Sequence, residues 1–370
     1  MIKPFANYLS LDQQELLTSQ IAKIINKGQY VLGEFTEKLE NVVKAETHAP
    51  FAKTVSSGTV ALELIFEYLE KAGHRKVAVQ SNTNFATVSA VVRAGLEVIF
   101  IDCDRFGQLC LKDLKSKFDI YHFDACAIVH IGGFFSDKLE EIHSFLIHNN
   151  IKLIEDCAHA HGTKTPLGPV GGLGYASIFS YFPTKVVNGG EGGVLVTADQ
   201  DLAEFAHKWR NQGKGGVYGN DHSVLGGSYR MPEINCAIAF TYYQILSTEI
   251  ANRKDKFTYL IDNVQGIEFC EPPENSEVSF YKMICLIEGK NGSEIEEMLK
   301  AFDVVPGGAV YRKPCHVQPV FSGLKLGVEN LSGTDNFCSL HFCPPLHSKI
   351  SNVEMELLAS RLNKIGETCA

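Results

Sequence analysis

The stretch KVAVQSNTNFATVSAVVRAGLEVIFID, residues 76–102, holds two short apolar runs with an amphipathic segment between them. The runs are Lys76–Gln80 and Glu97–Asp102, and the segment that joins them is Phe85–Ala94. Runs that are apolar along their whole length are typical of strands buried on both faces, and longer periodic segments are typical of helices. The stretch therefore predicts a strand, a helix and a second strand of one sheet.

The same alternation continues on both sides of this stretch. Four more apolar runs predict strands: Ala125–His130, Ile151–Glu155, Ala176–Tyr181 and Gly193–Thr197. Three further segments predict helices: Thr59–Ala72, Asp137–Asn149 and Gln200–Asn211. This order indicates an α/β fold with a largely parallel sheet covered by helices on both faces. Because ligands of such sheets bind beyond the carboxyl ends of the strands, the residues that follow each strand are the candidates for a site.

The pattern changes after about Asn235. Long helices are expected first, and a strand and two more helices follow: Cys236–Leu246, Thr248–Val264, Phe280–Ile287 (the strand), Gly292–Phe302 and Ser351–Ile365. We expect a large domain with an N-terminal arm over residues 1–245 and a smaller α+β domain over residues 246–370.

Composition narrows the class of protein. The chain has 370 residues, of which 45% are hydrophobic and 21% are charged, as in globular proteins. Its net charge of −9 argues against nucleic acid as the main partner. Eleven cysteines without the spacing of a small disulfide-bonded domain predict free thiols in a reducing compartment. The sequence shows neither a signal-peptide pattern nor a long apolar run, so we expect a cytoplasmic protein that does not associate with a membrane.

Three features near the predicted strands could carry chemistry. Ser56–Thr59 opens a helix with small residues, which suits an anion such as phosphate, although an ordinary helix cap has the same composition. Asp156 follows a strand and could face a ligand, or could bind a metal together with His159 and His161. Lys185 stands in an apolar, Gly-rich segment, where burial would free its amine to attack carbonyls. An exposed loop lysine is the alternative.

Together the three features suit one cofactor. Pyridoxal phosphate needs an amine to form a Schiff base, a carboxylate to keep its ring nitrogen protonated, and a cradle for its phosphate. Lys185, Asp156 and the Ser56–Thr59 turn would supply these groups. Spacing alone does not compel this interpretation.

The ordered motifs resemble the DegT/DnrJ/EryC1/StrS family, which are sugar aminotransferases of fold-type I that use pyridoxal phosphate. They run from GQYVLGEFTEKLE (residues 28–40) through SSGTVAL (56–62), TNFAT (83–87) and IEDCAHAHG (154–162), then FSYFPTKVVNGGEGGVLVT (179–197), SYRMPEINCAIA (228–239) and KPCHVQP (313–319). The resemblance implies a seven-stranded, mostly parallel sheet between helices, a smaller C-terminal domain, and a homodimer whose active sites are shared between subunits.

The resemblance also implies roles for individual residues. Lys185, Asp156 and His159 match the catalytic positions. The cofactor-binding positions match Ser57, Gly58, Thr59, Phe85, Asp156, His159, Ser180, Lys185 and Ser228. Ser228 stands where most members carry an Asn that reaches the phosphate of the neighbouring subunit. His316 and Arg230 are candidates for substrate contacts, each with a structural role as the alternative. Cys338, His341, Cys343 and His347 have irregular spacing for zinc, so no metal site is expected.

The resemblance implies an aminotransferase that takes its amino group from glutamate or glutamine. A keto sugar, most simply a nucleotide-linked keto-deoxy sugar made for lipopolysaccharide, capsule or a secondary metabolite, would accept the group. A free keto sugar, an eight-carbon keto-sugar acid or an inosose is the alternative acceptor. The other alternative is a non-catalytic protein that binds the cofactor or a nucleotide sugar as a sensor.

Overall fold

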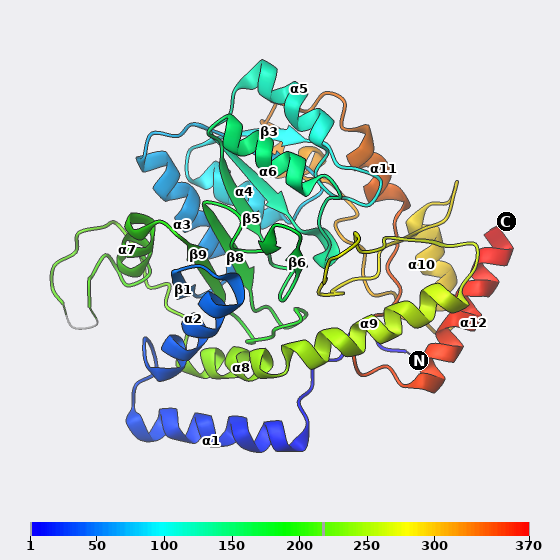
Figure 1. Ribbon diagram of the computed structural model, residues 1–370, viewed down its shortest axis with the longest axis horizontal. Helices are drawn as coiled ribbons and strands as arrows, with labels where there is room; N and C mark the ends of the chain where they lie inside the picture. Colours follow the sequence, from blue (N-terminus) through cyan, green and yellow to red (C-terminus); the bar gives the residue numbers. More distant parts are fainter. Residues whose placement is uncertain (1, 217–218, 370) are drawn as a thin grey trace.

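The computed structural model describes residues 2–216 and 219–369, and its centre is a seven-stranded sheet (Figure 1). The strand order is β1-β9-β8-β5-β4-β2-β3. The bounds are β1 Phe51–Val55, β2 Lys76–Gln80, β3 Glu97–Ile101, β4 Ala125–Val129, β5 Lys152–Asp156, β8 Ala176–Ser180 and β9 Gly193–Thr197. Within this sheet β9 runs antiparallel to both of its neighbours, and the other pairings are parallel. The expected fold class is confirmed.

The sheet is buried on both faces, which explains its apolar strands. In β2, Val77 and Val79 belong to an apolar cluster that also includes residues of α3 (Gly58–Lys71), α4 (Phe85–Arg93) and α7 (Gln200–Trp209). Ala78 points to the opposite face and packs with α5 (Leu111–Tyr121) and α6 (Leu139–His148). Because neighbouring side chains of a strand alternate between faces, a strand covered on both sides cannot show a polar face.

Two helices from opposite ends of the large domain complete the cover of the second face. These are α2 (Glu34–Thr47) and α8 (Glu233–Gln244), which pack against each other and against β1 and β9. A buried carboxylate joins them: Glu233 accepts hydrogen bonds from the backbone N–H groups of Gly33 (2.9 Å), Phe35 (2.7 Å) and Thr36 (2.9 Å). Glu233 thereby caps α2, whose N-cap Gly33 has no side chain to do so.

The C-terminal part forms an apolar cluster together with neighbouring residues of the large domain. It contains α9 (Leu246–Asn263), α10 (Gly292–Ala301), α11 (Ser332–Leu340) and α12 (Asn352–Cys369). Short strands accompany them: β10 (Glu268–Phe269) pairs with β11 (Cys285–Leu286), and elsewhere β6 (Lys164–Thr165) pairs with β7 (Gly168–Pro169). Turns of 3₁₀ helix span Ile131–Gly133, Cys315–Val317 and Pro319–Phe321. The expected division at residue 245 falls between α8 and α9.

The strand expected over Phe280–Ile287 is therefore wrong in length, since only Cys285–Leu286 forms a ladder. Phe280 has a left-handed backbone (φ 49°), which an extended strand does not allow. The segment turns at this point, and the following residues Tyr281 and Lys282 line a cavity instead.

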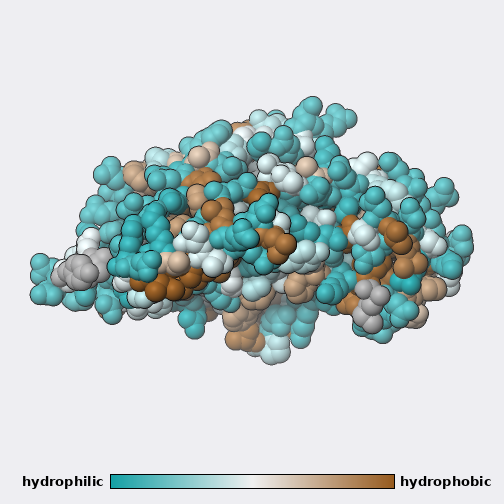
Figure 2. All heavy atoms as spheres, turned by 90° about the horizontal axis from the view of Figure 1, so that it is seen from below, coloured by the Kyte–Doolittle hydropathy of each residue, from teal (hydrophilic) through white to brown (hydrophobic). Residues whose placement is uncertain are grey.

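An N-terminal arm precedes α1 (Leu11–Lys27), which lies against α8 (Figure 1). The arm begins beside the C-terminal part, where Ile2 bridges Val304, and it passes the loop between β8 and β9. Apolar patches interrupt the hydrophilic surface on the side of the molecule that Figure 2 shows. Of the helices in residues 2–216 and 219–369, none combines the length and hydrophobicity needed to cross a membrane.

Candidate active site

The carboxyl ends of the parallel strands and the start of β9 meet at one edge of the sheet. Val55, the last residue of β1, pairs with Gly193, and so does Ser180, the last residue of β8. Gly193 must be glycine, because a Cβ atom there would overlap the backbone of Ser57 and Gly58. The Gly-rich segment thus lets β9 approach the turn between β1 and α3.

The turn predicted to bind an anion lies at the start of α3. Ser57 is the N-cap of α3, and its Oγ accepts a hydrogen bond from the N–H of Val60 (3.2 Å). Ser57, Gly58 and Thr59 line a cavity of about 350 Å³ together with Ser180. Free N–H groups and the positive end of the helix dipole make such a turn suitable for a phosphate.

Asp156 lines the same cavity and is the last residue of β5. Its side chain is almost fully buried and accepts hydrogen bonds from Thr87 Oγ1 (2.9 Å) and the N–H of Ala158 (3.1 Å). Burial raises the pKa of this carboxyl group, while the hydrogen bonds and the nearby Lys185 ammonium oppose the rise. A cationic group in the cavity would stabilise the charged carboxylate further.

Lys185 lines this cavity from the loop between β8 and β9. Its Nζ lies 5.0 Å from the centre of the Tyr281 ring. The pKa of the amine is lowered to about 8, chiefly by burial and also by the ammonium of Lys282, while Asp156 opposes both. A large neutral fraction near physiological pH is what a lysine nucleophile needs.

The N-terminal arm holds the loop that carries Lys185. Asn7 Nδ2 donates hydrogen bonds to the carbonyl groups of Pro183 (2.5 Å) and Lys185 (3.2 Å). Tyr242 of α8 in turn donates to the carbonyl group of Asn7 (2.7 Å). Sequence reasoning missed Asn7, because its partners lie more than 170 positions away in the chain.

His159 connects this cavity to a second one of about 450 Å³. The two cavities share Asn84, His159, Phe182, Lys185 and Tyr311. The Nδ1 atom of His159 accepts the N–H of Gly132 (3.3 Å), so we assign the proton to Nε2, which lies 3.2 Å from Tyr311 Oη. Burial, followed by the charge of Lys185, holds the pKa of His159 well below its ordinary value, and the ring is therefore neutral.

Phe85 does not reach the cavity, although we expected it to pack on the cofactor. Its side chain is 54% exposed and stacks on Phe321, with ring centres 5.3 Å apart. The neighbouring Asn84 lines both cavities instead and caps α4 by accepting the N–H of Ala86 (2.9 Å). At a helix start, adjacent side chains point in different directions, so Asn84 lines the two cavities and Phe85 does not.

Three other candidates also lie outside the two cavities. Arg230 donates hydrogen bonds to Asn211 Oδ1 (2.7 Å) and to Ser228 Oγ (2.5 Å), and Ser228 is exposed. His316 lies near Ser81, with 2.7 Å between its Nδ1 and the Ser81 Oγ, and its Nε2 is 3.4 Å from Asp335. These contacts lie within one subunit, and neither His316 nor Arg230 lines the two cavities.

The metal alternative for Asp156, His159 and His161 finds no support in the positions of these side chains. His161 packs among aromatic rings, with Phe179 at 5.2 Å and Tyr181 at 5.9 Å between ring centres. One group of possible ligands in the described residues is His130, Glu155 and Cys157, all of them buried. Glu155 is already occupied there, because it accepts N–H groups of the turn at Gly171, Leu173 and Gly174 and pairs with His130 at 3.1 Å.

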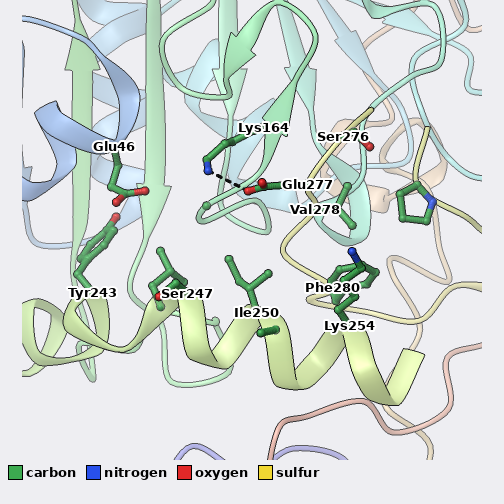
Figure 3. Close-up of a pocket in the computed structure, with 14 residues that line it drawn as sticks. Glu46, Lys164, Tyr243, Ser247, Ile250, Lys254, Ser276, Glu277, Val278 and Phe280 are labelled. Carbon is green, nitrogen blue, oxygen red and sulfur yellow. Dashed lines mark ion pairs between the residues drawn. The ribbon is translucent and has the colours of Figure 1, made fainter. Parts of the chain in front are cut away.

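A further cavity, of about 500 Å³, opens beside α9 and shares no lining residue with the other two. Figure 3 shows Lys164 and Glu277 paired across it, at 2.8 Å, with Ile250 and Lys254 on the helix below. Both partners of this ion pair are more than half exposed, so the pair contributes little to stability. The candidate chemistry lies in the other two cavities.

Comparison with known proteins identifies the family to which the chain belongs. A sequence profile described as the DegT/DnrJ/EryC1/StrS aminotransferase family matches residues 11–363. The chain is 30% identical over 302 residues to GDP-perosamine synthase from Escherichia coli O157:H7, covering 81% of this chain and 80% of that one. It is 27% identical over 322 residues to a pleiotropic regulatory protein from Geobacillus stearothermophilus, covering 85% of each chain.

Solved structures agree in fold. A DegT DnrJ EryC1 StrS aminotransferase from Brucella abortus superimposes with a TM-score of 0.87 at 21% identity, over 95% of this chain and 96% of that one. PseC from Helicobacter pylori, an aminotransferase of pseudoaminic acid biosynthesis, gives a TM-score of 0.87 at 19% identity, over 98% of both chains. The fold is that of the fold-type I transferases. The chain belongs to the DegT/DnrJ/EryC1/StrS aminotransferase family.

Proposed function

We propose that this aminotransferase uses pyridoxal 5′-phosphate to move an amino group from glutamate or glutamine to a nucleotide-linked keto sugar. The observation that carries the proposal is that Lys185, Asp156 and the Ser57–Thr59 turn line one cavity. Relatives named GDP-perosamine synthase and dTDP-3-amino-3,6-dideoxy-alpha-D-galactopyranose transaminase support the nucleotide-linked sugar as the acceptor.

The residues present fit this cofactor. Lys185 would hold its aldehyde carbon, Asp156 would pair with its ring nitrogen, and Ser57, Gly58, Thr59 and Ser180 would hold its phosphate. Bound there, pyridoxal phosphate supplies a protonated ring that withdraws electrons from the reacting carbon. The hydrogen bonds from Thr87 and Ala158 keep the Asp156 carboxylate in place for that ring nitrogen.

The remaining chemistry falls to Lys185 and His159. A base that moves protons works best when its pKa lies near the working pH, and the Nζ of Lys185 has a pKa of about 8. We propose that this nitrogen takes the proton from the reacting carbon of the amino-acid donor and delivers it to the cofactor. Neutral His159, placed between the two cavities, separates the cofactor side from the substrate side and adds no charge there.

The proposal is tested with purified protein, glutamate or glutamine, and a panel of nucleotide-linked and free keto sugars. We expect an aminated product by mass spectrometry, and its loss in Lys185→Ala but not in Lys254→Ala, a surface lysine on α9. Full turnover by Lys185→Ala would refute the role of this lysine. A keto-sugar acid or an inosose that reacts when nucleotide sugars do not would replace the proposed acceptor.

A sensor without catalytic activity is the second candidate, and the regulatory name of the relative from Geobacillus stearothermophilus favours testing it. Formation of an aminated product distinguishes the two functions. A sensor would bind the cofactor and the nucleotide sugar yet form no aminated product from any donor and acceptor pair.

We further propose a homodimer in a reducing compartment such as the cytoplasm. Phe5, Phe182 and Phe85 are large apolar side chains around half exposed, and the first two line the second cavity. A second subunit would cover such side chains. All eleven cysteines are free thiols, which suits a reducing environment. Light scattering tests the dimer, and weaker cofactor binding in Ser228→Ala would show that exposed Ser228 reaches a site in the partner.

A further inference from the structure

The second cavity is lined by cationic side chains without a carboxylate to balance them. Lys185, Arg253 and Lys282 line it, and none of its lining residues in the described parts of the chain is Asp or Glu. Asp156 lies in the first cavity, on the other side of Lys185. A cavity with this balance favours an anionic ligand.

Arg253 uses one of its guanidinium nitrogens within the protein. Its side chain is 3% exposed, and its Nη1 donates hydrogen bonds to the carbonyl groups of Phe280 (3.3 Å) and Leu346 (3.1 Å). These bonds fix the turn at Phe280, where the backbone is left-handed. The guanidinium therefore holds the wall of the cavity through Nη1 and adds positive charge to it, while its buried Nε has no hydrogen-bond partner in the described part of the chain.

Lys282 retains donors for a ligand. Among the hydrogen bonds of residues 2–216 and 219–369, its ammonium makes one, to the carbonyl group of Gly307. An ammonium group has three N–H donors, so two remain. The Nζ lies 5.4 Å from the centre of the Tyr281 ring, and the Nζ of Lys185 lies 5.0 Å from the same point. The two nitrogens are therefore no further apart than the sum of these distances, and both residues line the same cavity, where one substrate could contact both.

The loop beside Lys282 adds backbone donors. Residues 306–309 line the cavity, and Gly308 has a left-handed backbone (φ 83°). The N–H of Gly307 donates to the carbonyl group of Cys343 (2.7 Å), whereas those of Gly308 and Ala309 donate to no group in the described part of the chain. Adjacent free amides near an ammonium group suit the two oxygens of a carboxylate.

The burial of Lys282 is consistent with a carboxylate ligand at this place. It lowers the pKa of Lys282, because a partly satisfied ammonium is costly away from water. A carboxylate bound in the cavity would restore the charged form. The substrate's reacting carbon must lie near Lys185, so an anionic group bound at Lys282 must be close to that carbon. A carboxylate of a small substrate meets this condition. The diphosphate of a nucleotide sugar is further from the reacting carbon and fits less well.

We propose that Lys282, with the amides of Gly308 and Ala309, forms a subsite that binds a carboxylate of the substrate. The inference rests on the proposed aminotransferase function, and it deepens it by naming a specificity-determining residue. Two substrates could supply the carboxylate: the amino-acid donor, or an acceptor that is a keto-sugar acid.

The first test measures binding without turnover. Glutarate, a dicarboxylate that cannot react, is titrated into purified wild-type protein, Lys282→Met, Lys282→Gln and the control Lys254→Met by calorimetry. We expect the dissociation constant to rise about tenfold to a hundredfold in both Lys282 variants, as for the loss of a charged hydrogen bond, and to stay unchanged in the control. Melting temperatures close to that of wild type show that the variants are folded. Equal binding of glutarate by wild type and the Lys282 variants would overturn the subsite.

The second test finds the source of the carboxylate. Each half-reaction is followed separately by absorbance, with glutamate or an amine that lacks a carboxylate as donor, and with neutral or carboxylated keto sugars as acceptor. We expect Lys282→Met to raise KM about tenfold more for the carboxylated member of one pair than for its uncharged counterpart. Any change in kcat that comes from the altered pKa of Lys185 should be the same for both members of the pair. Equal effects on charged and uncharged substrates would refute the proposal. If wild type binds glutarate but shows no half-reaction at all, the subsite stands and the aminotransferase function fails.

Discussion

The pKa of Lys185 in the cofactor-free protein responds to two neighbouring charges of opposite sign, and this response can be measured. The pKa of the amine falls from 10.5 to about 8, chiefly through burial, with Lys282 lowering it and Asp156 raising it. At pH 8 about half of such amines are neutral, compared with about 0.3% of ordinary lysines. The environment therefore increases the reactive fraction roughly 150-fold.

Two substitutions should move this value in opposite directions. Asp156→Asn keeps the shape of the side chain and removes an attractive negative charge, so the pKa of Lys185 falls. Lys282→Met removes a repulsive positive charge, so the pKa rises. The side-chain amide that Asp156→Asn introduces can still accept from Thr87 Oγ1, which keeps the local hydrogen bond.

Competitive labelling provides the assay. Cofactor-free protein is treated with a trace of acetic anhydride at a series of pH values, and acetylation of Lys185 is quantified by peptide mass spectrometry against exposed Lys254. We expect a midpoint near pH 8 for Lys185 in wild type. A midpoint near 10.5, or a rise in Asp156→Asn, would refute the electrostatic account of the lysine.

Three other substitutions test the surroundings of the site. His161 is buried and its pKa is lowered to about 3, so below pH 6.5 the unfolded chain binds a proton that the folded chain excludes. The free energy of unfolding then falls by about 1.4 kcal/mol per pH unit from about 6.5 toward about 3, and His161→Phe should flatten urea denaturation midpoints over this range; unchanged acid sensitivity would contradict it. Gly193→Ala should destabilise the fold by about 1–3 kcal/mol and speed cofactor loss, because its Cβ would overlap Ser57 and Gly58; a native melting temperature would disprove this crowding. Thr87→Val removes a hydrogen bond to a buried carboxylate and should cost about 1.5–3 kcal/mol in urea unfolding, with weaker cofactor retention, whereas full retention would show that Asp156 does not depend on Thr87.

The sheet could be predicted because its strands are apolar on both faces. The predicted strand Lys76–Gln80 is β2 without any change of bounds, and the other predicted strands of the sheet agree to within a residue or two. The sequence pattern misses β1, because Phe51–Val55 lies at the edge of the sheet and Lys53 interrupts its apolar run. It also misses helix α1, although Ser10 and Gln13 form a capping box that marks its start.

The site was predictable where a residue directly follows a strand and less so elsewhere. Asp156 and the Ser57–Thr59 turn line one cavity with Lys185 because parallel strands end at one edge. Tyr311 and Lys282 come from the C-terminal part, and their place beside Lys185 depends on long-range packing that no local pattern reports.

The most direct measurement starts from the protein as purified, treated with borohydride and then digested. The account predicts a yellow protein that loses its colour on reduction and yields one peptide, spanning residue 185, that carries a phosphopyridoxyl group on Lys185. A phosphopyridoxyl group on a different lysine, or a protein that binds no pyridoxal phosphate when the vitamer is supplied in excess, would contradict it.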